Sequence, residues 1–260
     1  MTLDTAMLDH ALSVACAAAD AAEAVIARWY RRGVAVETKS DESPVTIADR
    51  EAEREIRRVL GAAFPDHGYY GEEYGRDDAR SDFLWLIDPI DGTKSFVRDY
   101  PFFSTQIALM HRGELVLGVS SARQFGETAC ARRGSGATLD DAPMRVSRCT
   151  TLESAAISFG NLKTLASGPR WQKLAPLVAR ANRTRGYGDF YHYHLLARGS
   201  IDAVIESDVN ILDIAALVAI VREAGGVFTD LEGRAIGLET TSVLAAATPE
   251  LHRVLLDALR

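Results

Sequence analysis

The segment at positions 85–96, Trp-Leu-Ile-Asp-Pro-Ile-Asp-Gly-Thr-Lys-Ser-Phe, combines residues that could bind a metal and a phosphate. Its apolar run ends in two aspartates three positions apart, Asp88 and Asp91, and Gly-Thr follows. Carboxylates, the carbonyl of Ile90 and a threonine hydroxyl are the hard oxygen ligands that suit Mg²⁺, which uses substrate phosphate to complete its shell. A helix that begins just after Gly92 would also offer unpaired N–H groups to a phosphate. The segment therefore predicts metal-assisted phosphoester chemistry.

The same segment has a simpler interpretation, and so do the other acidic residues that could join it. Asp-Pro and Asp-Gly pairs are common turn formers, so the segment alone is also consistent with a tight turn. Asp49 and Asp213 stand where two helices are expected to begin, and the helix dipole favours aspartate there. Glu72 and Glu73 lie in a polar loop bounded by glycines and could be a solvated pair. The metal interpretation gains support because the same chain carries these further carboxylates, which could join Asp88 and Asp91 at one site.

The overall charge calls for a local source of positive charge at any phosphate site. The 260 residues carry a formal net charge of −7, with a sequence pI near 5.4. A protein that binds nucleic acid without regard to sequence needs a basic face, so no nucleic-acid partner is expected. The same negative charge would repel a phosphate ester, and bound metal ions are the natural means of inverting the local field.

Cysteine usage and hydropathy predict a soluble protein in a reducing compartment. The three cysteines, Cys16, Cys130 and Cys149, lack Cys-x-x-Cys spacing, which favours neither a disulfide framework nor a zinc site. The N-terminal stretch carries acidic residues and many alanines, unlike the basic start of a secretory signal. We find no apolar run that approaches membrane-spanning length, so we expect a cytoplasmic protein without a membrane partner.

Hydrophobic periodicity predicts an α+β N-terminal half followed by an α/β C-terminal half. In the first half we expect helices over 3–31 and 47–63 and strands over 83–87, 104–110, 115–121 and 128–132. In the second half we expect strands over 155–159, 203–206, 227–229 and 242–246, alternating with helices over 169–181, 191–198, 213–224 and 249–259. We see no flexible linker between the halves, so we expect one integrated unit.

Taken together and in order, the motifs resemble the inositol monophosphatase family of Mg²⁺-dependent, lithium-sensitive phosphatases. The resemblance covers essentially the whole chain and rests on Gly-Glu-Glu at 71–73, Asp-Pro-Ile-Asp-Gly-Thr at 88–93, Leu-Asp-Ile-Ala-Ala at 212–216 and Glu-Ala-Gly-Gly at 223–226. Lys39, with Val-Thr before Asp49, matches the family's N-terminal motif. The resemblance implies a layered αβαβα sandwich of the inositol monophosphatase and fructose-bisphosphatase type. It further implies an N-terminal α+β subdomain over 1–145 and a C-terminal α/β subdomain over 146–260.

The resemblance also implies the metal ligands. A first Mg²⁺ would be held by Glu72, Asp88 and the Ile90 carbonyl, and a second by Asp88, Asp91 and Asp213. Glu72 would help to hold a third, weaker ion. Two or three Mg²⁺ would then neutralise the phosphate, lower the pKa of a bound water and stabilise the leaving alkoxide in an in-line displacement.

Catalytic roles follow from the same resemblance. Thr93 and Glu72 would position and deprotonate the attacking water, with Asp49 close by as a group that does not touch the metal directly. Backbone N–H groups of Gly92 and Thr93 would bind phosphate oxygens at the helix start. This chemistry needs no covalent phosphoenzyme.

Two departures from the inositol-specific pattern point to a different substrate. Lys-Ser-Phe-Val-Arg at 94–98 and Gly-Asp-Phe-Tyr at 188–191 resemble the histidinol-phosphate phosphatase branch of the family. Histidinol phosphate carries a protonated amine near its phosphate and an imidazole that can gain charge. Carboxylates at Asp189 and at the expected substrate residue Glu206 would favour such a cation over a neutral polyol. The branch therefore implies substrate contacts from Gly188, Asp189 and Glu206, and the dephosphorylation step of histidine biosynthesis.

Several alternatives stay open on the sequence. Asp189 could instead cap the helix that follows it. The substrate could be inositol 1-phosphate or another small sugar or nucleotide phosphate. A regulatory binding protein is a third hypothesis, although a scaffold has no need for so many like charges in one place. The family resemblance also implies a homodimer, whose interface the residues do not indicate.

Overall fold

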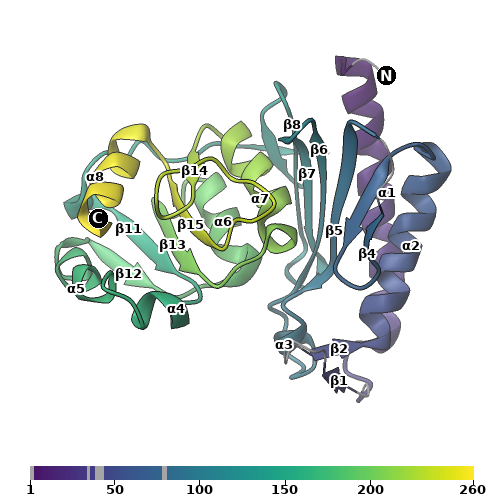
Figure 1. Cartoon of the computed structure of the whole chain (residues 1–260), viewed down its shortest axis with the longest axis horizontal. Helices are drawn as coiled ribbons and strands as arrows, with labels where there is room; N and C mark the ends of the chain where they lie inside the picture. The colour runs from purple at the N-terminus through teal and green to yellow at the C-terminus, as the bar shows by residue number, and fades with distance from the viewer. Residues whose placement is uncertain (1–2, 34–35, 39–43, 78–80) are drawn as a thin grey trace.

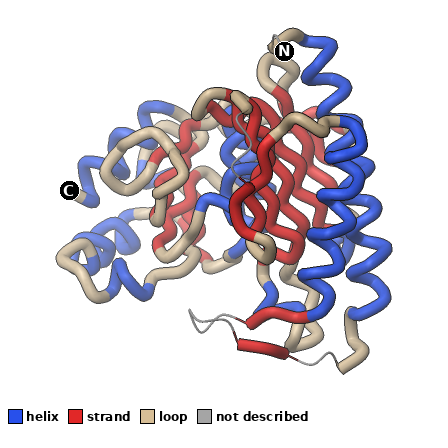
Figure 2. Tube along the Cα trace, turned by 45° about the vertical axis from the view of Figure 1, so that its right-hand side comes forward, coloured by secondary structure: helices blue, strands red, loops and turns tan. Residues whose placement is uncertain are grey.

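Helices and sheets alternate in layers across the molecule (Figure 1). The computed structural model describes residues 3–33, 36–38, 44–77 and 81–260. Two long N-terminal helices cover one face of an eight-stranded sheet, and Figure 2 shows them side by side along it. Two further helices lie between this sheet and a five-stranded sheet, whose far face is covered by three more. The arrangement confirms the predicted layered αβαβα sandwich, while the subdomain boundary at 145/146 stays a prediction.

The described helices are α1 (Thr5–Trp29), α2 (Ile47–Ala63), α3 (Thr93–Phe96), α4 (Lys163–Ala166), α5 (Trp171–Arg180), α6 (Asp189–Ala197), α7 (Ile211–Glu223) and α8 (Pro249–Leu259). The outer N-terminal layer consists of α1 and α2, and the central layer of α6 and α7. The layer beyond the five-stranded sheet contains α4, α5 and α8. Both α6 and α7 begin two residues earlier than predicted, which places Asp189 and Asp213 inside the first turn of their helices.

The eight-stranded sheet contains β3 (Gly68–Gly71), β4 (Gly75–Asp77), β5 (Phe83–Asp91), β6 (Ser104–His111), β7 (Glu114–Ala122), β8 (Glu127–Arg132), β9 (Ala137–Leu139) and β10 (Ala142–Met144). The five-stranded sheet contains β11 (Ala156–Phe159), β12 (Arg183–Arg185), β13 (Ala203–Ser207), β14 (Val227–Thr229) and β15 (Ser242–Ala246). Their orders are β10-β9-β8-β7-β6-β5-β3-β4 and β12-β11-β13-β15-β14. A separate pair, β1 (Val36–Thr38) and β2 (Pro44–Thr46), precedes α2.

Strand β5 extends further than the apolar run predicts, because it continues through the acidic motif to Asp91. Its register with β6 shifts between Asp88 and Asp91, which is the mark of a β-bulge. Pro89 fits at such an irregularity because it has no N–H to leave unpaired in the ladder. The motif is therefore an irregular strand end, neither a regular strand nor a simple tight turn.

Helix α1 packs an alanine-rich face against α2 and the eight-stranded sheet. Ala11, Ala15, Ala18 and Ala22 are fully buried, and their small side chains allow close helix packing. Within the described ranges α1 is the one helix long and apolar enough to cross a membrane by length and composition. This corrects the expectation that no apolar run approaches that length. Its buried face nevertheless belongs to the core that it shares with α2 and β5–β7.

Helix α7 lies against the eight-stranded sheet at a point where β7 has no side chain. A Cβ atom on Gly118 would lie 2.3 Å from the carbonyl oxygen of Ala216 on α7. Ala215 and Ala216 are buried in the same contact. Because α7 also carries Asp213, this close approach sets how near that carboxylate can come to the aspartates at the end of β5.

Gly118→Ala tests this contact. The added methyl group must push α7 away from β7, so we expect the free energy of unfolding to fall by about 1–3 kcal/mol, the range typical of overpacking. Urea unfolding followed by circular dichroism measures it. Gly237→Ala is the matched control, because a Cβ there would meet nothing within 4 Å. Equal stability of the two variants would contradict the packing account.

Candidate active site

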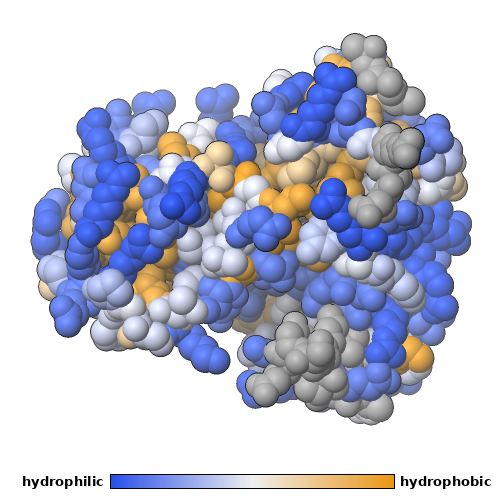
Figure 3. Space-filling view, viewed as in Figure 1, coloured by the Kyte–Doolittle hydropathy of each residue, from blue (hydrophilic) through white to orange (hydrophobic). Residues whose placement is uncertain are grey.

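An acidic cavity of about 270 Å³ is lined by residues from both halves of the chain. The lining residues are Glu72, Asp88, Ile90, Asp91, Gly92, Thr93, Lys94, Ser95, Asn161, Asp189, Asp208 and Asp213. They include every predicted metal ligand and both predicted phosphate-binding residues. Figure 3 shows the molecule notched at its lower edge, between the side that holds α3 and the side that holds α4. Two larger cavities, of about 520 and 620 Å³, are lined by other residues, so volume alone does not mark the site.

The turn from β5 into α3 presents the central aspartate and the predicted phosphate-binding groups. The Ile90 N–H donates a hydrogen bond of 3.0 Å to Oδ1 of Asp88. Gly92 adopts a left-handed φ of 91°, and α3 begins at Thr93, as predicted. A Cβ on Gly92 would lie 2.5 Å from the carbonyl oxygen of Phe102, so a larger residue would displace that loop. The strand end is thus fixed by local bonds and by close backbone packing.

Asp49 and Asp213 occupy equivalent positions, each the third residue of a helix with a capping box. Asp213 accepts hydrogen bonds from the backbone N–H (2.9 Å) and side-chain amide (2.7 Å) of Asn210. Asp49 accepts bonds from the backbone N–H (2.7 Å) and hydroxyl (2.6 Å) of Thr46. The simpler interpretation, that both support a helix N-terminus, is therefore correct. Asp213 also lines the cavity, whereas Asp49 contacts Thr93, a lining residue, at 3.2 Å.

Three carboxylates converge at the centre of the cavity. One oxygen atom from each of Asp88, Asp91 and Asp213 lies within 4.8 Å of the other two. Burial first, and then the surrounding carboxylates, raise the pKa of Asp88 and Asp91 well above the usual range. Burial, only partly offset by the Asn210 hydrogen bonds, raises the pKa of Asp213 to about 7. This all-oxygen, charge-crowded donor set fits a hard divalent cation such as Mg²⁺.

Glu206 lies in a smaller pocket that it shares with Asp189. The Tyr193 hydroxyl donates a 2.7 Å bond to Oε2 of Glu206, and the Asn161 N–H donates a 3.1 Å bond to Oε1. The Nε2 atom of His192 lies 3.2 Å from Oε2. Burial would raise the pKa of Glu206, but His192 and these hydrogen bonds bring it below its usual value. Glu206 therefore stays ionised next to the acidic cluster.

Asp189 lines both the acidic cavity and the smaller pocket beside it. Its φ of 46° is left-handed, a conformation that aspartate tolerates better than most residues. Gly188 is the N-cap residue of α6, so the alternative that Asp189 caps this helix is wrong. Burial and the Glu206 charge raise the pKa of Asp189 to about 6. Gly188 is not among the lining residues of either pocket, and its substrate contact stays a prediction.

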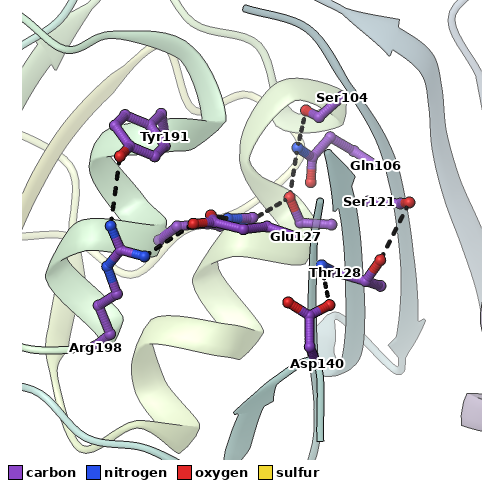
Figure 4. Close-up of polar contacts among 10 residues, drawn as sticks. Ser104, Gln106, Ser121, Glu127, Thr128, Asp140, Tyr191 and Arg198 are labelled. Carbon is purple, nitrogen blue, oxygen red and sulfur yellow. Dashed lines mark hydrogen bonds and ion pairs between the residues drawn. The ribbon is translucent and has the colours of Figure 1, made fainter. Parts of the chain in front are cut away.

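Asp91 ends a chain of buried polar side chains on β6 and β7. The Nε2 atom of Gln106 donates hydrogen bonds to Oγ of Ser104 (2.7 Å) and to Oγ of Ser120 (3.0 Å) (Figure 4). Because both serine oxygens accept from this amide, each hydroxyl hydrogen is directed away from it. Ser104 donates onward to Oδ2 of Asp91 at 3.4 Å. One buried amide therefore sets the direction of the bond that reaches the cluster.

The other branch of this chain leads to α6. The Nε2 atom of His194 lies 2.9 Å from Oγ of Ser120, and its Nδ1 atom lies 3.1 Å from Oε2 of Glu127. Burial lowers the pKa of His194, so the neutral ring accepts from Ser120 and donates to Glu127. Arg198 donates a 2.9 Å bond to the other oxygen of Glu127 (Figure 4). These bonds join α6 to the eight-stranded sheet.

Sequence reasoning missed Asn161 and Asp208, which line the cavity just beyond β11 and β13. These two strands are parallel neighbours, so their carboxyl ends meet at one sheet edge, where ligands commonly bind in α/β sheets. Each of these polar residues lies two positions after the end of a predicted strand, and that position was the signal available in the sequence. Lys39, part of the family's N-terminal motif, lies outside the described residues.

Comparison with known proteins finds relatives that match almost the whole chain. The sequence model of the inositol monophosphatase family matches residues 7–260. A histidinol-phosphatase of Mycobacterium tuberculosis is 40% identical over 85% of this chain and 88% of its own length. A histidinol-phosphatase of Streptomyces coelicolor is 38% identical over 99% of this chain and 97% of its own. Among solved structures, the extragenic suppressor protein SuhB of Bartonella henselae matches with a TM-score of 0.89 and 31% identity, covering 96% of this chain and 98% of that one.

The crowded carboxylates make the stability of the metal-free protein depend on pH. The pKa of Asp213 rises from an ordinary 3.8 to about 7 on folding, so its ionisation opposes folding increasingly as the pH rises through this window. The pKa of Asp91 shifts in the same direction. We expect the metal-free protein to melt at a lower temperature at pH 8 than at pH 6. Differential scanning fluorimetry should show that Mg²⁺ raises the Tm more at pH 8, because the cation binds the ionised carboxylates.

Asp91→Asn removes one of these charges and keeps the side-chain shape. We expect the metal-free Tm at pH 8 to rise by a few degrees, and both the Mg²⁺-induced Tm shift and the hydrolytic activity to be lost. Asp141→Asn, an exposed position outside the cavity, is the control and should change neither property. A full Mg²⁺ response in Asp91→Asn would contradict the assignment of this cluster.

Proposed function

The chain belongs to the inositol monophosphatase family, and from this premise we propose that it hydrolyses L-histidinol phosphate to L-histidinol and phosphate. It is a phosphoric monoester hydrolase. The observation that carries the proposal is one cavity in which Asp88, Asp91 and Asp213 converge beside the start of α3, with Asp189 among the same lining residues. The three converging aspartates suit metal-assisted phosphate chemistry, and Asp189 suits a cationic substrate.

We assign the metal ligands to Glu72, Asp88, the Ile90 carbonyl, Asp91 and Asp213, which together would hold two or three Mg²⁺. When bound, these ions neutralise phosphate charge, lower the pKa of a water and stabilise the leaving alkoxide. The assignment is supported by the closeness of three carboxylates and by their raised pKa values, since a cation is what would keep them ionised.

Thr93 is held where it can orient the attacking water. Its Oγ1 atom lies 3.2 Å from Oδ1 of Asp49 and 3.0 Å from the Ile90 carbonyl oxygen. The single hydroxyl hydrogen bonds one of these acceptors at a time, so the Thr93 oxygen is free to accept a hydrogen from water. We propose that Glu72, which lines the same cavity, takes the proton, and that the Gly92 and Thr93 N–H groups bind phosphate oxygens.

The substrate end of the cavity favours a cation. Asp189 and Glu206 add two carboxylates beside the metal cluster, and they share a pocket with Tyr193. A protonated amine gains charge-assisted hydrogen bonds from such groups, whereas the hydroxyl groups of inositol gain less. The relatives named histidinol-phosphatase, at 38–40% identity, support the same choice.

The cellular setting follows from this substrate. We propose that the protein acts in histidine biosynthesis, in the cytoplasm and as a homodimer. The spacing of the three cysteines, Cys16, Cys130 and Cys149, does not favour a disulfide framework, which supports a reducing compartment. The dimer rests on the family resemblance, and light scattering of the purified protein tests it.

Phosphate release from L-histidinol phosphate and from myo-inositol 1-phosphate, measured side by side with and without Mg²⁺, tests the proposed function. We expect Mg²⁺-dependent release, with kcat/KM at least about tenfold higher for histidinol phosphate, or ~1.4 kcal/mol of transition-state discrimination. Preference for inositol phosphate would overturn the proposed substrate and would leave the proposed reaction unchanged. Absence of Mg²⁺-dependent release from both esters would contradict the histidinol-phosphate proposal.

Asp189→Asn tests the recognition of the amine. Loss of one charge-assisted hydrogen bond, worth about 1.5–3 kcal/mol, should lower kcat/KM for histidinol phosphate by about 10- to 100-fold. Turnover of inositol phosphate should change much less. Asparagine also tolerates the left-handed φ at this position, and Asp141→Asn, at φ 65° outside the cavity, controls for the backbone. Equal losses on both substrates would instead indicate a structural role.

A further inference from the structure

A buried ion pair on α2 lies beneath the turn that carries Glu72. Arg57 Nε donates a 2.8 Å hydrogen bond to Oε1 of Glu53, one helical turn earlier. The Glu53 side chain is fully buried, and that of Arg57 is 21% exposed. Burying two charges carries a large desolvation penalty, and a well-packed apolar pair is often no less stable. The contacts that the pair makes with the turn are therefore its distinctive contribution.

Glu53 binds the start of the turn. Its Oε2 atom accepts a 2.7 Å hydrogen bond from the Glu73 N–H, the residue after Glu72. A Cβ on Gly71 would lie 1.9 Å from Oε1 of Glu53, so the carboxylate fills the space that any other side chain would need. The glycine before Glu72 is thus explained by the Glu53 carboxylate that lies against it.

Arg57 binds the end of the turn. Its guanidinium donates a 2.8 Å hydrogen bond to the carbonyl oxygen of Gly75, where β4 begins. The guanidinium also lies over the rings of Tyr69 and Tyr74, at 5.6 and 5.8 Å from their centroids. Together the two side chains hold both ends of the 71–75 turn against α2.

The opposite side of the turn is fixed by the sheet. The Glu72 N–H donates a 3.2 Å hydrogen bond to the carbonyl oxygen of Ile87, the residue before Asp88. Glu72 is therefore held between β5 on one side and the Glu53–Arg57 pair on the other. Both supports bind backbone atoms of the turn. They therefore fix the position from which the Glu72 side chain extends.

We propose that Glu53 and Arg57 are positioning residues that place the Glu72 carboxylate for metal binding, an inference that rests on the proposed function. Groups that orient a metal ligand typically change metal affinity 10- to 100-fold when they are replaced. Loss of either partner should thus weaken the occupancy of the metal site. It should leave the chemistry at saturating Mg²⁺ largely intact, since neither residue lines the cavity.

Glu53→Gln is the central variant. The Arg57 Nε–H and the Glu73 N–H bind different oxygens of Glu53, and glutamine replaces one of these oxygens with an NH₂ group that faces a donor, so one of the two bonds is lost. We expect the dissociation constant for Mn²⁺, measured by electron paramagnetic resonance of the free ion, to rise at least about tenfold. The Mg²⁺ concentration for half-maximal activity should rise in parallel, with little change in kcat at saturation.

The control lies on the same helix. Glu55 pairs with Arg58 by two hydrogen bonds, at 2.7 and 3.0 Å, on the exposed side of α2. Glu55→Gln changes the net charge by the same amount and should bind Mn²⁺ like the wild type. Arg57→Lys is a second, milder variant, which keeps the charge and loses the fork that reaches both Glu53 and Gly75. It should weaken Mn²⁺ binding even if Glu53→Gln fails to fold.

The outcomes separate the inference from the function on which it rests. Weaker Mn²⁺ binding in folded Glu53→Gln or Arg57→Lys, with normal binding in Glu55→Gln, supports the positioning role. Wild-type affinity in both test variants, or equal weakening in the control, overturns it. Wild-type protein that binds Mn²⁺ no more tightly than Asp91→Asn would overturn the metal site itself and this inference with it.

Discussion

Repulsion among buried carboxylates is the constraint on which the rest of this structure depends. Asp88, Asp91 and Asp213 place oxygen atoms within 4.8 Å of one another, in a cavity where burial and mutual charge raise the pKa of all three. Such an arrangement opposes folding unless cations offset it. The scaffold must therefore hold these groups in place with stability gained elsewhere. It does so from the end of one strand, β5, and from the first turn of the helix α7 that packs against the same sheet.

The scaffold meets this demand by fixing two of the acids through the local structure around them. A β-bulge with its own hydrogen bond fixes Asp88, and a capping box fixes Asp213. The close approach of α7 to Gly118 sets the distance between the elements that carry them. The buried chain through Gln106 connects the eight-stranded sheet to α6, so the helix that carries Asp189 is aligned with the sheet that carries Asp88 and Asp91.

Local patterns predicted the fold and the centre of the site, and non-local contacts account for what they missed. The helices at 47–63 and 249–259 have strong periodicity and cap signals, and their predicted bounds are those of α2 and α8. Each acidic motif is a short continuous run of residues, so its members could be named from the sequence. The short strand β3 was missed because two of its four residues are glycine, which is uncommon in strands, and because pairing with β4 and β5 on either side is what supports it. Glu53 was missed because only tertiary structure places it against Gly71.

The central claim is that these carboxylates form a binding site for divalent cations. A crystal structure of the protein with Mn²⁺, recorded at a wavelength where manganese scatters anomalously, tests it most directly. We expect anomalous peaks about 2 Å from oxygen atoms of Asp88, Asp91 and Asp213, with a further peak at Glu72. Manganese bound only elsewhere on the surface, with the cluster of aspartates empty at saturating metal, would contradict the account.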